Sequence, residues 1–498
     1  MRVVIVGAGT TGTQLAKQLI REKHDVSLIE SNAEKARHAS NRMDCLVVQD
    51  EGNSIGALTE AGAAKADALV CVTDSDEVNM IICGLAESRY PGLLKIARVR
   101  NDEYASLNPS PRDEGDKNGA PRGAEAKMLG IDYFVRPNLE AARWALDAIE
   151  HRAMGNIISF AGTMYELGTI DVSGGSALDG ISLINYRSLF PAESLVTLVE
   201  RNVDGEETAI LPSGSTVLSA GDRVSILSRE EDMDRIFHLA GQAEKPLRRI
   251  GIAGGGRLGS LIAEGLFSKQ DKPGAGIFSG LKKFITRRNR QVVIIEEDYE
   301  LCKNLAARFP GALVLNEDIT DENFVAEEQL GDLDLIVTAT GRQDFNLVTA
   351  AYLKSRGVAR AITMVTSPGY AAIARQLGID VVIPLQSVVV DTILTRLMGG
   401  GITGLHRLGE GGIGILEFEM GVNAPFAEQA LKNCAFPEGT LVMLINRGGR
   451  SFIPKGDDTL TPGDRIILLA RNGNESEIGR LFNAPGAAHI PAVMGRGG

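Results

Sequence analysis

MRVVIVGAGTTGTQLAKQLIREKHDVSLIE, residues 1–30, is the stretch of sequence that decides the fold. Its apolar run, residues 2–6, is typical of a buried parallel strand. A glycine-rich turn, residues 7–12, follows at once, and an amphipathic helix pattern follows the turn. A second apolar run, residues 26–29, ends in Glu30. This order of strand, glycines, helix and strand-terminal acid predicts a βαβ unit that binds a nucleotide at its first turn.

Each glycine of the turn has a separate role in such a unit. Gly7 permits the tight turn, Gly9 lets the backbone approach a pyrophosphate, and Gly12 lets the helix pack closely on the strand. The helix N-terminus offers free N–H groups and a partial positive charge to phosphates. Glu30 is placed to accept hydrogen bonds from a ribose. The predicted contacts of this first site are Gly7, Ala8, Gly9, Thr10, Thr11, Gly12 and Glu30.

The residues after the acid bear on the choice of cofactor. Glu30 is followed by Ser31 and Asn32 and not by an arginine. A 2′-phosphate needs a cation at this place. The sequence therefore favours NAD(H) or an adenine nucleotide over NADP(H).

The same order of strand, glycine-rich turn, helix and strand-terminal acid occurs a second time. The apolar run 249–253 leads into a glycine-rich turn, residues 254–259, and a helix pattern continues through residues 261–267. The next apolar run, residues 292–295, ends in Glu296. Such a repeat indicates a tandem duplication. The predicted contacts of the second site are Gly254, Gly255, Gly256, Arg257, Leu258, Gly259, Glu296 and Asp318.

A smaller repeat lies downstream of each unit, as a set of turn residues with matching spacing. The sequence thus predicts an α/β fold: two Rossmann-like, doubly wound parallel-sheet domains, each followed by a small α+β domain. We expect these domains at residues 1–153, 154–245, 246–404 and 405–485, with a tail at 486–498. The two sets are Pro212, Gly214, Leu218, Gly221-Asp222-Arg223 and Pro454, Gly456, Leu460, Gly463-Asp464-Arg465.

Two further stretches interrupt the Rossmann-like domains. Residues 106–123 are polar and rich in Pro and Gly, which predicts a flexible insertion. Residues 269–290 carry seven basic residues and one acidic residue, with apolar residues at helical spacing. This second insertion could be a basic amphipathic helix that lies on an anionic membrane or on a partner, or it could be a solvated loop. The helix pattern at 139–151 could link the first domain to the next or pack against a second copy.

Four further side chains follow predicted parallel strands of the first unit, where the ligand crevice of such a sheet lies. Asp50 could bond an adenine or ribose edge, and Arg98 could pair with a phosphate. Thr73 and Asp74 could position the central part of the cofactor. Each alone could instead be a helix cap or a surface charge, but together they favour ligand contact. In the second unit Gly341 replaces Asp74 and no arginine replaces Arg98, so that site should bind an anionic cofactor less well, take a different nucleotide, or be degenerate.

Composition limits the classes of function and location. The net charge of −12 argues against general nucleic-acid binding, which needs a basic face. Five cysteines without a CxxC pair suggest a reducing compartment. No apolar stretch has the roughly 18–20 residues of a transmembrane helix, and the chain starts with a strand and not with a signal peptide. We expect a cytosolic protein whose association with a membrane is peripheral.

Catalytic machinery is not apparent in the sequence. None of the six histidines lies in a motif or beside a strand end with a carboxylate partner, as hydride transfer would need. No nucleophile elbow, Walker lysine or metal-ligand cluster occurs. A binding fold without chemistry favours a sensor and not an enzyme. Two alternatives stay open: an NAD-dependent oxidoreductase with a duplicated Rossmann fold, and a nucleotide-binding scaffold without a membrane partner.

The segments VVIVGAGTTGTQLA, SLIE, VTDSDEVN and ARVRN, followed by the small repeat and then by a second copy of both parts, resemble the TrkA family. Its members are peripheral NAD-binding subunits of bacterial and archaeal Trk potassium uptake systems, built from two RCK-N/RCK-C domain pairs. The resemblance implies a cytosolic gating ring beneath a membrane potassium-translocating subunit of the TrkH/TrkG type. It also implies regulation by NAD(H) and by ATP or ADP, and homo-oligomers that are dimers or tetramers.

The resemblance also carries over site residues by position. It implies first-site contacts at 7–11, Glu30, Thr73, Asp74 and Arg98. In the second site it implies contacts at 254–258 and Glu296. Three features depart from the family pattern. Glu51 stands where the first unit often has Gly or Ala, Gly341 with the missing arginine weakens the second site, and the insertions at 106–123 and 269–290 are unusual additions.

Overall fold

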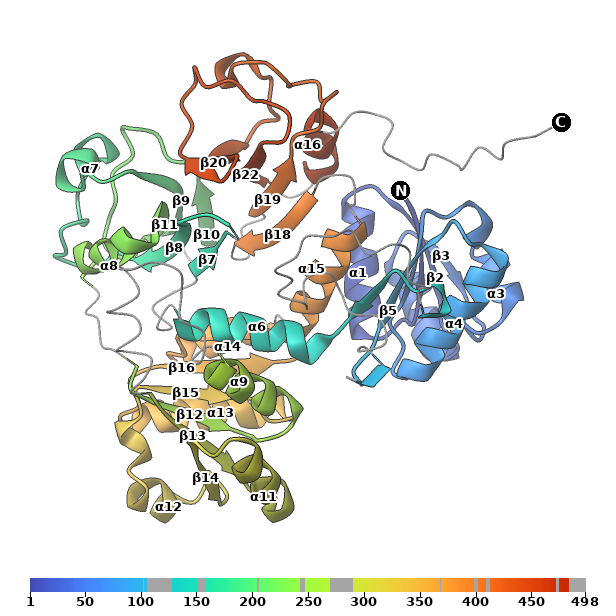
Figure 1. Ribbon diagram of the computed structural model, residues 1–498, viewed down its shortest axis with the longest axis horizontal. Coiled ribbons are helices and arrows are strands. Elements are labelled where there is room, and N and C mark those ends of the chain that lie inside the picture. Colours follow the sequence, from blue (N-terminus) through green and yellow to red (C-terminus); the bar gives the residue numbers. More distant parts are fainter. Residues whose placement is uncertain are drawn as a thin grey trace. The chain divides into compact units, whose positions relative to one another are not determined.

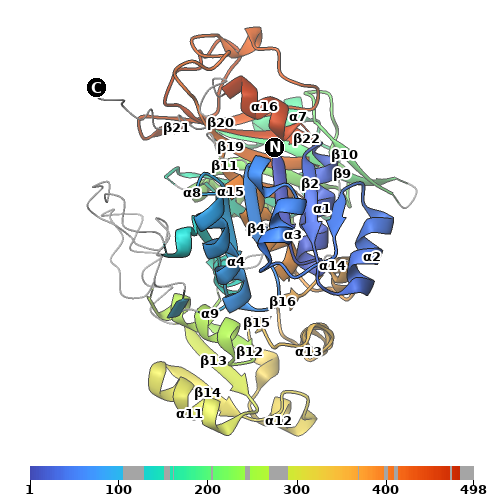
Figure 2. The ribbon, with the colours of Figure 1, turned by 90° about the vertical axis from the view of Figure 1, so that its right-hand side faces the viewer.

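The chain forms two compact units (Figure 1, Figure 2). One contains residues 1–156 and 245–393, which we call the first half and the second half of this unit; the other contains residues 157–244 and 394–498. The computed structural model describes residues 1–101, 103–104, 128–150, 157–160, 162–203, 206–241, 247–268, 290–367, 369–397, 402–408, 413–471 and 474–482.

Three of the sequence predictions concern residues outside these ranges. The expected insertion at 106–123 and the expected tail at 486–498 lie outside the described residues. The expected insertion at 269–290 lies outside them as well, apart from Arg290. The basic amphipathic helix considered for that insertion therefore stays a prediction.

The first half is a six-stranded parallel sheet in the order β3-β2-β1-β4-β5-β6. Val4 and Val6 of β1 pack with α3 and α4 in one apolar cluster, and the intervening Val3 and Ile5 are equally buried. Burial on both faces explains why the sequence shows continuous apolar runs and no alternation. The elements are β1 (Arg2–Val6), α1 (Thr10–Arg21), β2 (Asp25–Ile29), α2 (Ala33–Arg42), β3 (Leu46–Val48), α3 (Ile55–Glu60), η1 (Ala63–Lys65), β4 (Ala68–Cys71), α4 (Asp76–Arg89), β5 (Leu94–Arg98), η2 (Met128–Gly130), β6 (Tyr133–Val135) and α6 (Pro137–Glu150).

The second half repeats this topology in the order β14-β13-β12-β15-β16-β17. The predicted pair of Rossmann-like, doubly wound parallel-sheet domains is therefore confirmed. The elements are β12 (Arg249–Ala253), α9 (Arg257–Ser268), β13 (Gln291–Glu296), α11 (Tyr299–Arg308), β14 (Ala312–Asn316), α12 (Glu322–Glu327), η3 (Leu330–Asp332), β15 (Leu335–Thr338), α13 (Gln343–Ser355), β16 (Ala361–Val365), α14 (Gly369–Gln376), β17 (Val381–Pro384) and α15 (Leu385–Leu397).

Helix α6 follows the first sheet in sequence but packs on the second sheet. Its buried residues Ala141, Ala145 and Ile149 belong to one apolar cluster with Ile250 of β12 and Ile262 of α9. The two helices approach closely at Gly265, where an added Cβ would lie 2.1 Å from Leu146. Of the two possibilities that the sequence left open for this helix, the structure therefore places it against the second copy of the fold within the same chain.

Each of the small domains is a five-stranded sheet with antiparallel pairing, in the orders β10-β9-β11-β8-β7 and β18-β19-β22-β20-β21. The expected boundary after residue 404 falls inside β18. The elements are β7 (Ile157–Ser159), β8 (Tyr165–Asp171), α7 (Leu183–Leu189), β9 (Ser194–Val203), β10 (Glu206–Ile210), β11 (Arg223–Arg229), α8 (Glu230–Leu239), β18 (Ile402–Leu408), β19 (Ile413–Glu419), η4 (Leu431–Asn433), β20 (Leu441–Arg447), β21 (Arg450–Phe452), β22 (Arg465–Arg471) and α16 (Glu475–Phe482).

The repeated Gly-Asp-Arg turn of the small domains is a structural clamp. Arg201 donates from Nε and Nη2 to the two carboxylate oxygens of Asp222, at 2.7 and 2.6 Å, and from Nη2 to Val217 O. The Ser219 N–H donates to the same carboxylate at 2.8 Å. The second small domain repeats the arrangement with Arg447, Asp464, Thr459 O and the Thr461 N–H. The repeated spacing within the chain thus reflects how the turn is held.

The clamp also sets the ionisation of its acids. Burial alone would raise the pKa of the Asp222 carboxyl, but the Arg201 guanidinium and the Ser219 N–H outweigh burial and hold the pKa below its ordinary value. Asp464 has a lowered pKa for the same reasons, with Arg447 and Thr461 as the partners. A lowered folded-state pKa means that the stabilisation is complete above the unfolded aspartate pKa of about 4 and is lost as the pH falls through the folded value.

None of the helices in the described part of the chain combines the length and the apolar character that a membrane span requires.

We expect Asp222→Asn to lower the free energy of unfolding by about 1–3 kcal/mol at neutral pH, because Arg201 loses its charged acceptor. Urea unfolding followed by circular dichroism measures the loss. Asp171→Asn is the matched control: this carboxylate pairs with Arg223 at 3.3 Å but is 69% exposed, and we expect a change below about 0.5 kcal/mol. The difference between wild type and Asp222→Asn should shrink below about pH 4. Equal losses in the two variants would contradict the clamp.

Candidate nucleotide-binding sites

The turn between β1 and α1 is shaped by two close backbone approaches. Gly7 has a φ of +105°, which favours glycine, and its N–H donates to Ile29 O at 2.9 Å. An added Cβ on Gly12 would lie 1.9 Å from the carbonyl oxygen of Gly7, so the first turn of α1 can pack here only without a side chain. Gly9 differs, because an added Cβ there would meet no atom within 4 Å. The space over Gly9 at the N-terminus of α1 is open for a ligand.

Glu30 is held beneath this turn. Its side chain is only 9% exposed. Oε2 accepts the Ala8 N–H at 2.6 Å and Oε1 accepts the Asn32 N–H at 2.9 Å. The carboxylate thus fixes the turn, and each of its oxygens keeps a second lone pair for a further donor such as a ribose hydroxyl.

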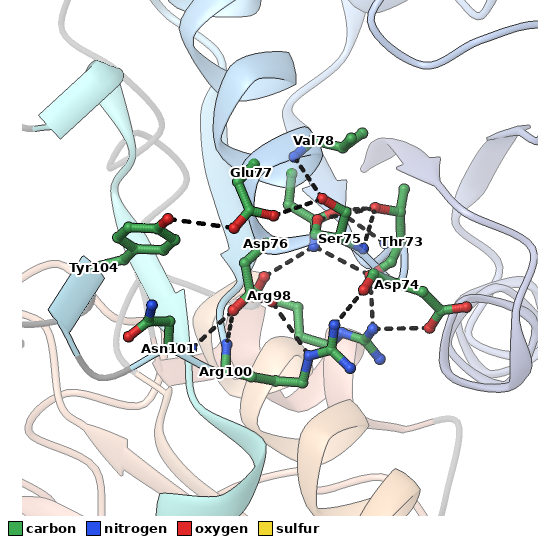
Figure 3. Close-up of polar contacts among 11 residues, drawn as sticks. Thr73, Asp74, Ser75, Asp76, Glu77, Val78, Arg98, Arg100, Asn101 and Tyr104 are labelled. Carbon is green, nitrogen blue, oxygen red and sulfur yellow. Dashed lines mark hydrogen bonds and ion pairs between the residues drawn. The ribbon is translucent and has the colours of Figure 1, made fainter.

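The ends of β4 and β5 bring together Thr73, Asp74 and Arg98, three of the residues for which the sequence analysis expects ligand contact (Figure 3). Arg98 Nη2 donates to Thr73 O at 2.6 Å and lies 3.1 Å from Asp74 Oδ1. The Asp74 side chain is 89% exposed, so this ion pair is open to solvent on one side. Arg98 Nε is buried and has no hydrogen-bond partner among the described residues. Arg98 therefore keeps one buried N–H donor without a partner at the end of β5.

An asparagine that the sequence analysis missed holds these strand ends in place. Asn79 of α4 is fully buried. Its Oδ1 accepts the N–H and the hydroxyl of Thr73, at 2.9 and 2.7 Å, and its Nδ2 donates to the carbonyls of Thr73 and Arg98. Asn346 makes the corresponding bonds to Thr340 and Met364 in the second half. Alignment of the two internal repeats, Thr73 with Thr340 and Asn79 with Asn346, would have been the signal for this pair.

A carboxylate that the sequence analysis also missed fixes the chain after β5 (Figure 3). The carboxylate of Asp76 accepts the backbone N–H groups of Arg100 and Asn101 at 2.7 and 2.8 Å, and the Arg100 side chain at 3.3 Å. Arg100 also donates to the Asp74 carbonyl. The pKa of the nearby Glu77 carboxyl is lowered by hydrogen bonds from the backbone N–H of Glu77 itself and from the Ser75 hydroxyl. These contacts order the segment that carries Arg98.

A cavity of about 580 Å³ lies at the N-terminal turn of α1, and we call it the first cavity. The predicted residues that line it are Ala8, Gly9, Thr10, Thr11, Asp74 and Arg98. The sequence analysis missed Lys17, Lys35 and His38, which line it from the outer faces of α1 and α2, and Gln386, which comes from α15.

The first cavity is therefore a basic one. Lys17, Lys35 and Arg98 line its wall against one acid, Asp74. Together with the N–H groups of the α1 N-terminus, these cations suit a ligand with phosphate groups.

The other predicted first-site residues lie behind or beside this wall. Gly7, Gly12, Glu30 and Thr73 shape the turn and the strand end and do not line the first cavity. Asp50 follows β3, is exposed, and accepts the Glu51 N–H at 2.8 Å.

The second half has a cavity of about 550 Å³ at the corresponding place, which we call the second cavity. Glu296 again holds the turn, with Oε2 accepting the Gly255 N–H at 2.7 Å and Oε1 accepting the Asp298 N–H at 3.1 Å. A Cβ on Gly259 would lie 1.9 Å from Gly254 O, and one on Gly256 would meet no atom within 4 Å. The predicted residues that line the second cavity are Gly254, Gly256, Arg257, Leu258, Glu296 and Asp318, whereas Gly255 and Gly259 do not line it.

The second cavity differs from the first in charge. Glu296, Glu297, Glu317 and Asp318 line it, against the two cations Arg257 and Arg342. The Thr320 N–H and hydroxyl, at 2.9 and 2.7 Å, lower the pKa of Asp318, which is therefore ionised at neutral pH. Four carboxylates against two cations oppose a highly anionic ligand.

Within the described ranges, no cluster of three or more His, Cys, Asp or Glu side chains is arranged to bind a metal ion. Two of the cysteines, Cys71 and Cys83, lie in contact in the core, with Sγ atoms 3.7 Å apart, and burial raises the pKa of Cys71 well above its ordinary value. They are packing residues and not ligands.

The chain matches two known domain families. The TrkA-N domain family matches residues 3–108 and 250–385, and the TrkA-C domain family matches residues 415–483, which together make up more than half of the chain. The Trk system potassium uptake protein TrkA of Halomonas elongata is 26% identical over 488 residues, which cover 97% of this chain and 98% of that protein. The TrkA homolog of Archaeoglobus fulgidus is 28% identical over 482 residues, 97% of this chain and 100% of that protein.

Solved structures give the same fold. The GsuK channel bound to NAD superposes with a TM-score of 0.53 at 16% sequence identity, over 96% of this chain and 78% of that one. The crystal structure of the GsuK RCK domain gives a TM-score of 0.52 at 15% identity, over 97% of this chain and 94% of that one.

The two glycines of the first turn should respond differently to the same substitution. We expect Gly12→Ala to cost about 3 kcal/mol of stability or more, because its Cβ would collide with the Gly7 carbonyl. Gly9→Ala should cost at most about 1 kcal/mol, because it only changes the N-cap residue of α1. Thermal unfolding of both variants gives the comparison, and a Gly9→Ala variant as unstable as Gly12→Ala would show that the space over Gly9 is not free.

Proposed function

The chain belongs to the TrkA family, and from this membership we propose that it is the nucleotide-sensing regulatory subunit of a potassium uptake system. The observation that carries the proposal is the first cavity. It combines free N–H groups at the α1 N-terminus, open space over Gly9, and three cations at its wall. Such a site is built for the phosphates of a nucleotide.

We assign NAD(H) to the first cavity, with ATP or ADP as competing ligands. The phosphates would lie over Gly9 and Thr10, and the Arg98 guanidinium would pair with one of them. Glu30 would accept the ribose hydroxyls, and its negative charge disfavours NADP(H). The similar fold of a channel whose structure contains NAD supports this choice of ligand class.

Asp50, Thr73 and Asp74 complete the proposed first site. Asp50 is exposed at the end of β3, where it could reach an adenine or ribose edge. Thr73 and Asp74 stand at the end of β4, beside the turn of Gly7. Their role is to position the middle of the ligand.

We assign a different binding strength to the second site. Its contacts would be the turn 254–259, Glu296 and Asp318, with Arg257 on the phosphate side. Because four carboxylates face this cavity, we assign it a weaker affinity for anionic nucleotides than the first cavity has.

The regulatory step would be a change in the arrangement of the two Rossmann-like halves. A nucleotide can favour one arrangement only by its difference in affinity for the two. Such couplings are typically about 1–3 kcal/mol, and a value near the upper end, about 2.6 kcal/mol, would shift a gate from about 10% open to about 90% open. The partner would be the membrane potassium-translocating subunit, which the chain would bind from the cytosolic side as a homodimer or homotetramer.

The role is proposed to be non-catalytic, in line with the names of the relatives as subunits of uptake systems. The alternative, an NAD-dependent oxidoreductase, requires that bound NADH be consumed. Incubation of the protein with NADH and loss of the NADH absorbance on addition of candidate substrates would favour that alternative.

Gly9→Val and Gly256→Val are a matched pair of substitutions at equivalent turns, and neither Cβ meets an atom within 4 Å. Isothermal titration calorimetry with NADH, NAD, ATP and ADP should show that Gly9→Val weakens the tightest binding by about a hundredfold, equal to roughly 2.7 kcal/mol. Gly256→Val should leave that binding nearly unchanged. The reverse result would assign the high-affinity site to the second cavity, and unchanged affinity in both variants would refute the turn as the phosphate site.

The same pair tests the physiological role. In cells that lack their own Trk regulatory subunit, wild-type protein should restore potassium uptake when it is produced together with its membrane partner. Gly9→Val should fail to restore nucleotide-dependent uptake while it still copurifies with the partner, because only ligand binding is lost. Full uptake with Gly9→Val would separate nucleotide binding from transport and contradict the sensing role.

A further inference from the structure

One residue in the wall of the first cavity does not come from the first half. Gln386 is the second residue of α15, in the second half, and it lines the first cavity beside residues of the β1–α1 turn. Its side chain is only 8% exposed. The backbone N–H of Gln386 donates to Thr366 O at 3.2 Å, but its carboxamide makes no hydrogen bond to any described residue. Neither carboxamide atom is among the fully buried side-chain atoms that lack a partner, so the group is open to the first cavity, where it can donate to a ligand.

The neighbouring residues place this carboxamide over the first turn of α1. Ser387 Oγ accepts a hydrogen bond from Gln14 Nε2 at 3.3 Å, and Gln14 itself lines the first cavity. Gln14 stands one helical turn after Thr10, the first residue of α1. Gln386 is therefore near the end of the first cavity where the helix N-terminus would hold phosphates.

The residue before Gln386 borders the other cavity. Leu385 lines the second cavity, so that two consecutive residues at the start of α15 border the two cavities. The arrangement is reciprocal, because Asn138, the second residue of α6, lies in the first half and lines the second cavity. In each case the residue that crosses over is a carboxamide at the same position of its helix.

We propose that Gln386 is a ligand contact that the second half donates to the first cavity, where its Nε2 donates a hydrogen bond to a phosphate of the bound nucleotide. A carboxamide provides two N–H donors, and a phosphate oxygen is a charged acceptor that strengthens the bond. The ligand is then held by both halves at once. This inference rests on the proposed nucleotide site and adds the residue through which a ligand in one half acts on the other.

The direct consequence is a coupling between the two halves. When a phosphate engages Gln386, it also restrains the first turn of α15, which borders the second cavity through Leu385. Ligand in the first cavity should therefore alter how the second cavity binds, and by linkage the reverse holds with the same factor.

The test is isothermal titration calorimetry on the full chain with ADP and with adenosine, which lacks phosphates. Gln386→Ala should weaken ADP by about tenfold, as expected for a lost hydrogen bond to a charged group. Gln386→Glu should weaken ADP by about a hundredfold, because a carboxylate repels the phosphate. Adenosine affinity should change less than about twofold in both variants, since the lost contact is to phosphate. Gln376→Ala, an exposed carboxamide on α14, is the control and should bind both ligands like wild type.

Each outcome decides between specific possibilities. ADP affinity of Gln386→Ala equal to that of wild type would overturn the inference and leave the proposed function intact. Equal losses for ADP and adenosine would also overturn it, because they would indicate a packing role. If wild type binds neither ligand, both the inference and the proposed function fail. Should Gln386→Ala not fold, Gln386→Met, which keeps the length of the side chain, makes the same comparison.

Discussion

The close approach of Gly12 to the carbonyl of Gly7 is the constraint on which the rest of the molecule depends. A single added carbon at Gly12 would lie 1.9 Å from that oxygen, and the same holds for Gly259 and Gly254 in the second half. The contact presses the first turn of each helix against the end of its strand, so that free N–H groups point into the crevice. Because it involves only backbone atoms, the contact has been kept while the side chains around the two crevices have diverged.

The two crevices differ more in the charge of their walls than in their geometry. Both acids at the second strand, Glu30 and Glu296, hold their turns by the same pair of N–H bonds, and Asn79 and Asn346 clamp the strand ends in the same way. The cavity walls carry opposite charge balances, basic in the first half and acidic in the second. A duplicated scaffold can thus keep two preformed crevices and assign them different ligands, since the frame and the wall are made by different residues.

The sequence predicts those parts of the structure whose cause is local. Buried strands appear as continuous apolar runs, and glycines appear where the backbone admits no Cβ, so both sheets and both turns could be located in advance. Helix α2 could not, because only Ala36 and Ala39 of its residues are buried and they form no apolar stripe. Lys17, Lys35 and Gln386 were missed because they reach the first cavity from the outer faces of helices or from the other half, which only the tertiary structure reveals. The boundaries of the small domains and the roles of the site residues remain predictions.

The packing of α6 from the first half against the second half determines how the two copies of the fold are joined. The apolar stripe of α6, with Ala141, Ala145 and Ile149, completes the core of the second half and not of its own. Separation of the halves would expose this stripe and remove the helix that covers α9. A single chain with two such halves has the internal contacts that two separate Rossmann domains would have to form by association. Because these contacts need no association step, under the proposed sensing role a small difference in ligand affinity between two arrangements would act directly on how the halves are packed.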